Sequence, residues 1–293
     1  MPVLSHGSVD RRRISDHRQL HGIRRALASS QTRLDPASCS LQIGDIVMNI
    51  PIVSRTEWLA ARRALLAKEK ELTHLRDALA TERRRLPMVR LEQDYVFRSE
   101  QGLRPLRDLF GPHPQLIVYH FMFQPDWDEG CPSCSQFADN FALLPAHLAA
   151  RDTAFAVVSR APIGKITAFK RRMGWTFPWV SSTDSSFNFD FHVTLDEAVG
   201  SAEYNFTPVP ELKARGKIWM DELPGLSVFW REGNALFHTY SAYARGLDHL
   251  INTYNFLDLT PLGRHEEGLQ WAQQWVRHRD RYSNDDVKCH ACT

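Results

Sequence analysis

Several residue types and patterns are scarce in this chain of 293 residues, and each scarcity excludes a class of protein. Its five cysteines are too few for a disulfide-stapled fold, and their odd number favours a reducing compartment. No hydrophobic run approaches the roughly 18 residues of a membrane span, the longest being residues 115–123. The first 47 residues also lack the hydrophobic segment of a secretory signal. We therefore expect a soluble, cytoplasmic protein with no membrane partner.

Charge of one sign is scarce as well, because the net charge is only +2. Residues 1–47 hold seven arginines and four aspartates, whereas the rest carries 29 basic and 30 acidic side chains. A nucleic-acid-binding domain usually presents a basic face, so the nearly neutral body predicts no nucleic-acid partner. The P-loop, dinucleotide-binding, zinc-protease and serine-hydrolase motifs are missing from the sequence, and we expect no cofactor.

A long helix is predicted near the start of the chain. Ser54 and Glu57 have the spacing of a capping box, and no glycine or proline follows until Pro87. The helix should therefore end at about Leu86. A seven-residue repeat of large apolar side chains favours either a face packed against its own domain or a homodimer contact; its members are Trp58, Leu65, Leu72, Leu79 and Leu86.

The remainder alternates between strand and helix patterns, which predicts a mixed sheet covered by helices. The run at residues 115–123 is typical of a central strand that is buried on both faces. A hairpin signal lies at residues 231–234. The other expected segments are strands at 94–98, 153–159, 177–181, 227–230 and 235–240, a helical turn at 106–110, and helices at 134–150, 162–173 and 247–257.

Four of the five cysteines form two C-x-x-C pairs, of which Cys131 and Cys134 lie between the central strand and the next helix. The amides and dipole of a helix start favour a thiolate, so the first sulfur should attack and the second should close a disulfide. Nearby acidic side chains at positions 126, 128 and 129 act against a negative charge. The direction of the net pKa shift is therefore left open by the sequence.

Six blocks, in this order along the chain, resemble the bacterial thioredoxin-like family known as domain of unknown function 899. The similarity covers about residues 50–282, and the blocks are Ser54–Arg62, Leu116–Phe123, Gly130–Ser135, Val158–Pro162, Arg172–Ser182 and Leu223–Phe229. The resemblance implies an α/β fold, a thioredoxin-like three-layer sandwich with a mixed central sheet, preceded by the long N-terminal helix. It divides the chain into an extended or disordered arm (1–47), a long amphipathic helix (48–90), the thioredoxin-like domain (91–282) and a tail (283–293).

The C-x-x-C pair at this strand-to-helix junction predicts a thiol-disulfide oxidoreductase with Cys131 as nucleophile and Cys134 as resolving thiol, acting on a thiol or disulfide of a protein or small molecule. Thioredoxin-like enzymes place a cis-proline before the strand that faces the pair, and Pro224 is the candidate here; the alternative is an ordinary trans turn at Pro224 and Gly225. The layout is also similar to peroxiredoxins, so a thiol peroxidase is the alternative. At the position where a peroxiredoxin has Thr or Ser three residues before its reactive cysteine, this chain has Asp128. A non-catalytic interaction protein is the third hypothesis.

Other readings of these residues stay open. Zinc would need ligands from the distant Cys289, His290 and Cys292, a gap far longer than usual, so we expect no metal. The terminal pair is expected to lie in a frayed tail, and Cys39 has no assigned role. His120 is expected to be a core residue rather than a proton carrier. Trp127 could pack or shape a docking surface, whereas core packing is expected for Trp175, Phe177 and Trp179.

Overall fold

The computed structural model describes residues 41–43, 46–48, 50–196, 198–199, 203–218 and 220–283. The chain divides into two compact units, one of residues 67–288 and one of residues 1–66 with 289–293. In the second unit, strand β1 (Leu41–Ile43) pairs antiparallel with β2 (Ile46–Met48). This pair overlaps the end of the predicted arm, whose first 40 residues lie outside the described ones.

The predicted N-terminal helix is confirmed as α2 (Arg55–Arg83), and it begins with the expected capping box. The Glu57 carboxylate accepts hydrogen bonds from the Ser54 amide at 2.9 Å and from the Ser54 hydroxyl at 2.6 Å. In return, the Glu57 amide donates to Ser54 Oγ at 3.3 Å. The helix ends three residues before the predicted Leu86, because the chain turns ahead of Pro87.

The apolar repeat of this helix is largely exposed. No residue of α2 is buried, and side chains of the repeat such as Trp58 and Leu79 remain 46% and 54% exposed. The expected burial of one helix face is therefore not seen among the described residues. A homodimer through this helix stays a prediction.

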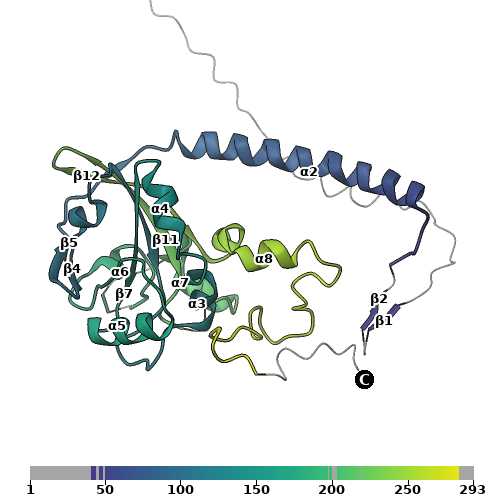
Figure 1. Ribbon diagram of the computed structural model, residues 1–293. Helices are drawn as coiled ribbons and strands as arrows, with labels where there is room; N and C mark the ends of the chain where they lie inside the picture. Colours follow the sequence, from purple (N-terminus) through teal and green to yellow (C-terminus); the bar gives the residue numbers. More distant parts are fainter. Residues whose placement is uncertain are drawn as a thin grey trace, which may run out of the picture. The chain divides into compact units, whose positions relative to one another are not determined.

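The larger unit is built on an eight-stranded mixed sheet in the order β3-β12-β11-β6-β7-β8-β4-β5 (Figure 1). At its centre β6 (Gln115–His120) runs parallel to β7 (Thr153–Ser159), which runs parallel to β8 (Trp179–Ser181). On the other side of β6, β11 (Gly225–Glu232) is antiparallel to it and forms a hairpin with β12 (Ala235–Tyr243). This parallel unit joined to an antiparallel hairpin is the predicted thioredoxin-like arrangement.

Shorter elements complete this unit. Three strands lie at the sheet edges: β3 (Val89–Arg90), β4 (Val96–Ser99) and β5 (Gly102–Pro105). A separate two-stranded ribbon consists of β9 (Glu203–Tyr204) and β10 (Thr207–Pro208). The helical segments are η1 (Leu106–Phe110), α3 (Pro132–Ala138), α4 (Leu144–Ala149), α5 (Ile163–Arg172), α6 (Phe187–Asp190), α7 (Val209–Ala214), η2 (Ala244–Leu250) and α8 (Asn252–Leu257).

The sheet buries a different core on each face, which makes three layers. Leu116 and Val118 of β6 pack with residues of η1 and α6, whereas Tyr119 packs with residues of α3, α5 and α8. This alternation follows from the period of two along a strand. The central strand is therefore covered on both sides, as its continuous hydrophobic run predicts.

Two predicted helices are each interrupted: residues 134–150 form α3 and α4, and residues 247–257 fall into the end of η2 and α8, with the extended Ile251 between them. The side-chain amide of Asn140 donates to the carbonyl oxygens of Gln136 (3.1 Å) and Phe137 (3.3 Å), which ends α3. Pro145 then occupies the first turn of α4, where a missing amide proton costs nothing.

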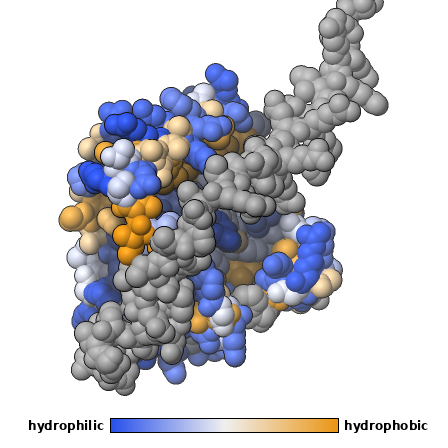
Figure 2. Space-filling view, turned by 90° about the vertical axis from the view of Figure 1, so that its right-hand side faces the viewer, coloured by the Kyte–Doolittle hydropathy of each residue, from blue (hydrophilic) through white to orange (hydrophobic). Residues whose placement is uncertain are grey.

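No helix among the described residues is long and apolar enough to cross a bilayer. Figure 2 shows hydrophilic residues over much of one face of the molecule, with hydrophobic residues in smaller groups between them.

A buried carboxyl group connects the loops that lead into β11. Glu222 is only 1% exposed, and it accepts hydrogen bonds from the Thr194 hydroxyl (2.9 Å) and the Asn188 amide (3.3 Å). Arg160 lies 3.6 Å from it. Burial raises the pKa of Glu222 to about 7, because these partners offset only part of the desolvation of the charged form.

This raised pKa predicts a pH-dependent stability. In the unfolded chain the Glu222 carboxyl ionises near its ordinary pKa of 4.5, whereas in the folded chain it stays protonated up to about pH 7. Between these pH values the folded state binds more protons than the unfolded state, so the free energy of unfolding falls as pH rises. The loss from pH 4.5 to 7 should be about 3 kcal/mol. Urea unfolding of the wild type and of Glu222→Gln at several pH values measures it. An equal pH dependence in both proteins would contradict the prediction.

Candidate active site

The C-x-x-C segment is brought back to the end of the central strand by a hydrogen-bonded loop. The chain leaves β6, continues through Met122, and returns so that the Cys131 amide donates to the Met122 carbonyl at 3.0 Å. Cys131 is the residue that caps α3, and its carbonyl accepts from the Ser135 amide (2.9 Å) and hydroxyl (2.8 Å). The first sulfur therefore sits at the helix start, as the sequence indicates.

The two thiols differ in exposure and in acidity. Cys131 is partly exposed, whereas Cys134 is 3% exposed, and both are unbridged. A hydrogen bond from the Cys134 thiol lowers the pKa of Cys131 to about 7, and the amides of Cys134 and Ser133 add to the effect. Burial raises the pKa of Cys134 well above its ordinary value. Cys131 is therefore the thiol that ionises first as pH rises.

Two tyrosines that the sequence did not single out lie around the buried thiol. The Tyr119 hydroxyl donates a hydrogen bond to Cys134 and thereby lowers the pKa of that thiol, against the effect of burial. Burial raises the pKa of Tyr204, and the charge of Cys134 raises it further. The phenol of Tyr204 is therefore also near the pair. The alternation along β6 could have suggested Tyr119, but no local signal marks Tyr204, which comes from the β9–β10 ribbon.

The loop before Cys131 is held by close packing and by a lysine. A Cβ atom on Gly130 would lie 2.6 Å from the Phe121 ring and 2.8 Å from the Phe169 ring, so only glycine fits. Lys165 of α5 donates to the carbonyl oxygens of Pro125 (3.0 Å) and Trp127 (2.9 Å). These contacts set the path of the loop that delivers the redox pair.

The acidic residues of this loop do not oppose the Cys131 thiolate in the expected way. Glu129 is paired with Arg172 (3.0 Å), and it also contacts Arg281 and His278. Asp126 and Asp128 are at least partly exposed, where solvent screens their charge. The basic partners were not predicted, because they come from α5 and from residues near the end of the described chain.

The segment around His278 is anchored directly beside the redox pair. His278 is 4% exposed, and its Nε2 donates to the Gly130 carbonyl at 2.8 Å. Arg172 pairs with Asp280 at 2.8 Å, and Arg279 bonds to Asp139. The neighbour of Cys131 is therefore fixed by a segment almost 150 residues away in the sequence.

Pro224 lies at the predicted place, just before β11, and of the two alternatives for its peptide bond the trans form is present. The described residues contain no cis peptide bond. The preceding segment is extended, because Leu195 donates to the Asp221 carbonyl (2.7 Å) and Leu223 to the Val193 carbonyl (2.8 Å). The chain thus enters β11 without a reversal. The Tyr204 hydroxyl donates to the Pro224 carbonyl at 2.9 Å and so connects this proline to the surroundings of Cys134.

His120 is a core residue and faces away from the thiols. It stacks on Phe187 and Phe191, its Nε2 is 2.9 Å from Ser227 Oγ, and burial lowers its pKa to about 3. Neutral at physiological pH, it packs with the opposite face of the sheet from Cys134.

Three aromatic residues with the expected core packing are Trp175, Phe177 and Trp179, and Trp127 is half-buried against the same cluster.

The described residues contain no group of three or more His, Cys, Asp and Glu side chains that could hold a metal ion. Cys39, Cys289, His290 and Cys292 lie outside the described residues. The expectations about the tail and about a zinc site built from it therefore stay predictions.

A thioredoxin-like sheet with a C-x-x-C pair between its central strand and the next helix defines the class of this protein. The chain belongs to the family described as "Bacterial protein of unknown function (DUF899)", whose model matches residues 47–282. The resemblance stated from the sequence blocks is thus confirmed. Comparison with curated proteins gives no match.

Similar solved structures include three bacterial peroxiredoxins. A cysteine-to-serine mutant of Xanthomonas campestris peroxiredoxin Q is 18% identical, with a TM-score of 0.38 over 57% of this chain and 90% of that one. Peroxidoxin BcpB from Mycobacterium tuberculosis is 14% identical, with a TM-score of 0.38 over 57% and 94%. A cysteine-to-serine mutant of Xylella fastidiosa PrxQ is 14% identical, with a TM-score of 0.35 over 55% and 88%. Such values transfer neither activity nor residue roles to this chain.

The packing of Gly130 predicts a sharp effect of one added methyl group. Gly130→Ala should lower the free energy of unfolding by about 1–3 kcal/mol, because Phe121 and Phe169 must move to admit it. Urea unfolding measures the change. Gly164→Ala is the matched control, since apart from its chain neighbours and the backbone of its own helix no described atom lies within 4 Å of its added Cβ. If both variants were equally stable, the loop would not depend on this contact.

Proposed function

We propose that the protein is a cytoplasmic thiol-disulfide oxidoreductase in which Cys131 is the nucleophile and Cys134 is the resolving thiol. The observation that carries the proposal is the asymmetry of the pair, one thiol partly exposed with a lowered pKa and one buried with a raised pKa. Thioredoxin-type chemistry needs this difference, because one sulfur must attack a substrate while the other waits as a thiol.

The reaction proceeds in two exchange steps. The Cys131 thiolate attacks one sulfur of a substrate disulfide, the substrate S–S bond breaks, and the other sulfur leaves as a thiolate that takes up a proton. Cys134 then loses its proton and attacks Cys131 in the mixed disulfide, which expels the second substrate thiol. The substrate gains two electrons and the enzyme is left with a Cys131–Cys134 disulfide. The reverse sequence oxidises a dithiol.

Pro224 is proposed to border the approach of the substrate to the pair. Its carbonyl is bound by Tyr204, whose phenol lies close enough to Cys134 for the charge of that thiol to affect its pKa. The substrate can be a disulfide or thiol of a protein or of a small molecule.

The thiol peroxidase alternative requires a group that donates a hydrogen bond to the peroxide. Position 128, where a peroxiredoxin has Thr or Ser, is an aspartate, which only accepts hydrogen bonds when it is ionised. This difference favours disulfide exchange over peroxide reduction. Peroxide consumption by the reduced protein, compared with that by free cysteine in stopped flow, distinguishes the two reactions.

The order of the two sulfurs can be tested by alkylation. Iodoacetamide should modify Cys131 first, with a rate that rises through about pH 7 as its thiolate forms. Cys134→Ala should move this midpoint upward, because the thiol that donates the stabilising hydrogen bond is gone. Peptide mass spectrometry at graded pH measures both. Cys131→Ser is the control, and its Cys134 should react slowly. Faster modification of Cys134 than of Cys131 between pH 6 and 8 would refute the assignment.

The hydroxyl of Tyr119 should assist only the second step. Tyr119→Phe removes a donor that lowers the pKa of Cys134, so the attack on the mixed disulfide should slow by about tenfold. Dithiobis(nitrobenzoate) separates the steps, since each releases one coloured thiolate. The first release should keep its wild-type rate.

Tyr254→Phe is the matched control for this variant, because it removes another buried phenol that bonds to Glu266 at 3.1 Å instead of to a thiol. It should leave both releases unchanged. Equal slowing of the two steps in Tyr119→Phe would indicate a general structural effect and not a role at Cys134.

A further inference from the structure

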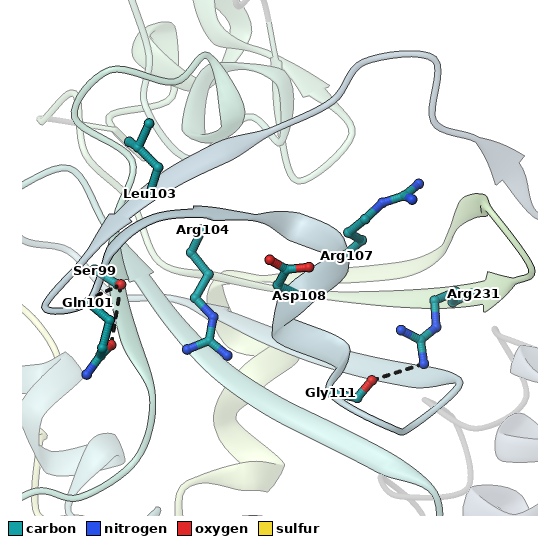
Figure 3. Close-up of a pocket in the computed structure, with 8 residues that line it drawn as sticks. All are labelled: Ser99, Gln101, Leu103, Arg104, Arg107, Asp108, Gly111 and Arg231. Atoms are coloured by element: carbon teal, nitrogen blue, oxygen red, sulfur yellow. Dashed lines mark hydrogen bonds between the residues drawn. The ribbon is translucent and has the colours of Figure 1, made fainter.

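A hollow of about 470 Å³ lies between the β4–β5 hairpin, η1 and the end of β11. Three of the side chains around it are arginines, Arg104, Arg107 and Arg231, and one is a carboxylate, Asp108 (Figure 3). Ser99 and Gln101 add a hydroxyl and an amide at its edge. Its lining is therefore mostly polar and basic, unlike the nearly neutral chain as a whole.

The backbone and an aromatic ring hold two of these guanidinium groups in place. Arg231 donates to the carbonyl oxygens of Gly111 (3.1 Å) and His113 (3.0 Å) and stacks over Phe110. Arg107 donates to the Asn234 carbonyl at 2.9 Å. A guanidinium has five N–H donors, so each keeps donors for a ligand after these bonds are made. Fixed arginines lose little freedom when they bind an anion.

The guanidinium group of Arg104 differs from the other two, because no described residue pairs with it. Its side chain is half-buried at the hollow, yet it has no hydrogen bond or ion pair with any residue that the structure describes. Asp108 likewise forms no ion pair within 4 Å among these residues, although Figure 3 shows it among the three arginines. The charges in the hollow are therefore not cancelled by mutual pairing.

We propose that this hollow binds the dianionic phosphate group of a small phosphate monoester. Three guanidinium groups and one carboxylate leave the hollow with a net charge of +2, which matches the charge of up to −2 on a phosphate monoester at neutral pH. The planar arginine fork also matches the spacing of phosphate oxygens and allows two parallel hydrogen bonds. The volume leaves room for the organic part of the ligand.

This site is separate from the redox pair. The Arg231 amide donates to the carbonyl of Pro114, the residue just before β6. The Cys131 amide donates to the carbonyl of Met122, which lies beyond the other end of that strand. The six residues of β6 alone span about 20 Å at 3.3 Å per residue. The proposal therefore does not rest on the oxidoreductase activity, and either can fail without the other.

Isothermal titration of the full-length chain with methyl phosphate at low ionic strength tests the proposal. Saturable binding is expected, and Arg104→Gln should weaken it by about tenfold, since it removes one charge-assisted contact. Asp108→Asn should tighten binding, because a repulsive charge disappears. A purely structural role of these side chains would not move affinity in opposite directions.

Two controls make the result decisive. Methyl sulfate has a similar shape but a single charge, so it should bind at least about tenfold more weakly than methyl phosphate. Arg215→Gln removes an exposed arginine that pairs with Glu211 on α7 and should leave the affinity unchanged. Absence of saturable binding, equal affinity for the two anions, or an equal loss in Arg215→Gln would overturn the proposal. If Arg104→Gln failed to fold, Asp108→Asn and methyl sulfate would still decide it.

Discussion

The hydrogen bond from the Cys131 amide to the Met122 carbonyl is the contact on which the candidate active site depends. It closes the loop that leaves the central strand and places the first thiol at the end of the sheet and at the start of α3. Since the strand is buried on both faces, this end is held rigidly. Gly130 permits the close packing of the loop, and Lys165 holds its backbone from α5.

The difference between the two thiols follows from this placement. Cys131 is partly exposed, and helix-start amides and the Cys134 thiol stabilise its negative charge. Cys134 points into the core, where burial disfavours the thiolate and the Tyr119 hydroxyl only partly compensates. Within one turn of helix, one sulfur is thus suited to attack a substrate and the other stays protonated until the second step. No cofactor enters the proposed chemistry.

The central strand also separates two surfaces with different chemistry. Beyond its last residue, His120, lie the thiols and the segment anchored by His278. Beside its first residue, Gln115, lies the basic hollow to which β11 contributes Arg231. A strand with continuous hydrogen bonding on both sides supports both surfaces, since a displaced register would move every side chain to the opposite face.

Local patterns in the sequence determined the elements and the motif. The capping box at Ser54, the buried run that became β6 and the C-x-x-C pair each arise from neighbouring residues, so they can be recognised without a fold. Tertiary structure alone decided what surrounds the pair, because Tyr204, Arg172 and His278 reach it from elements distant in the sequence. It also decided the acidity of the thiols and the trans bond before Pro224, since burial and strand pairing are properties of the folded chain.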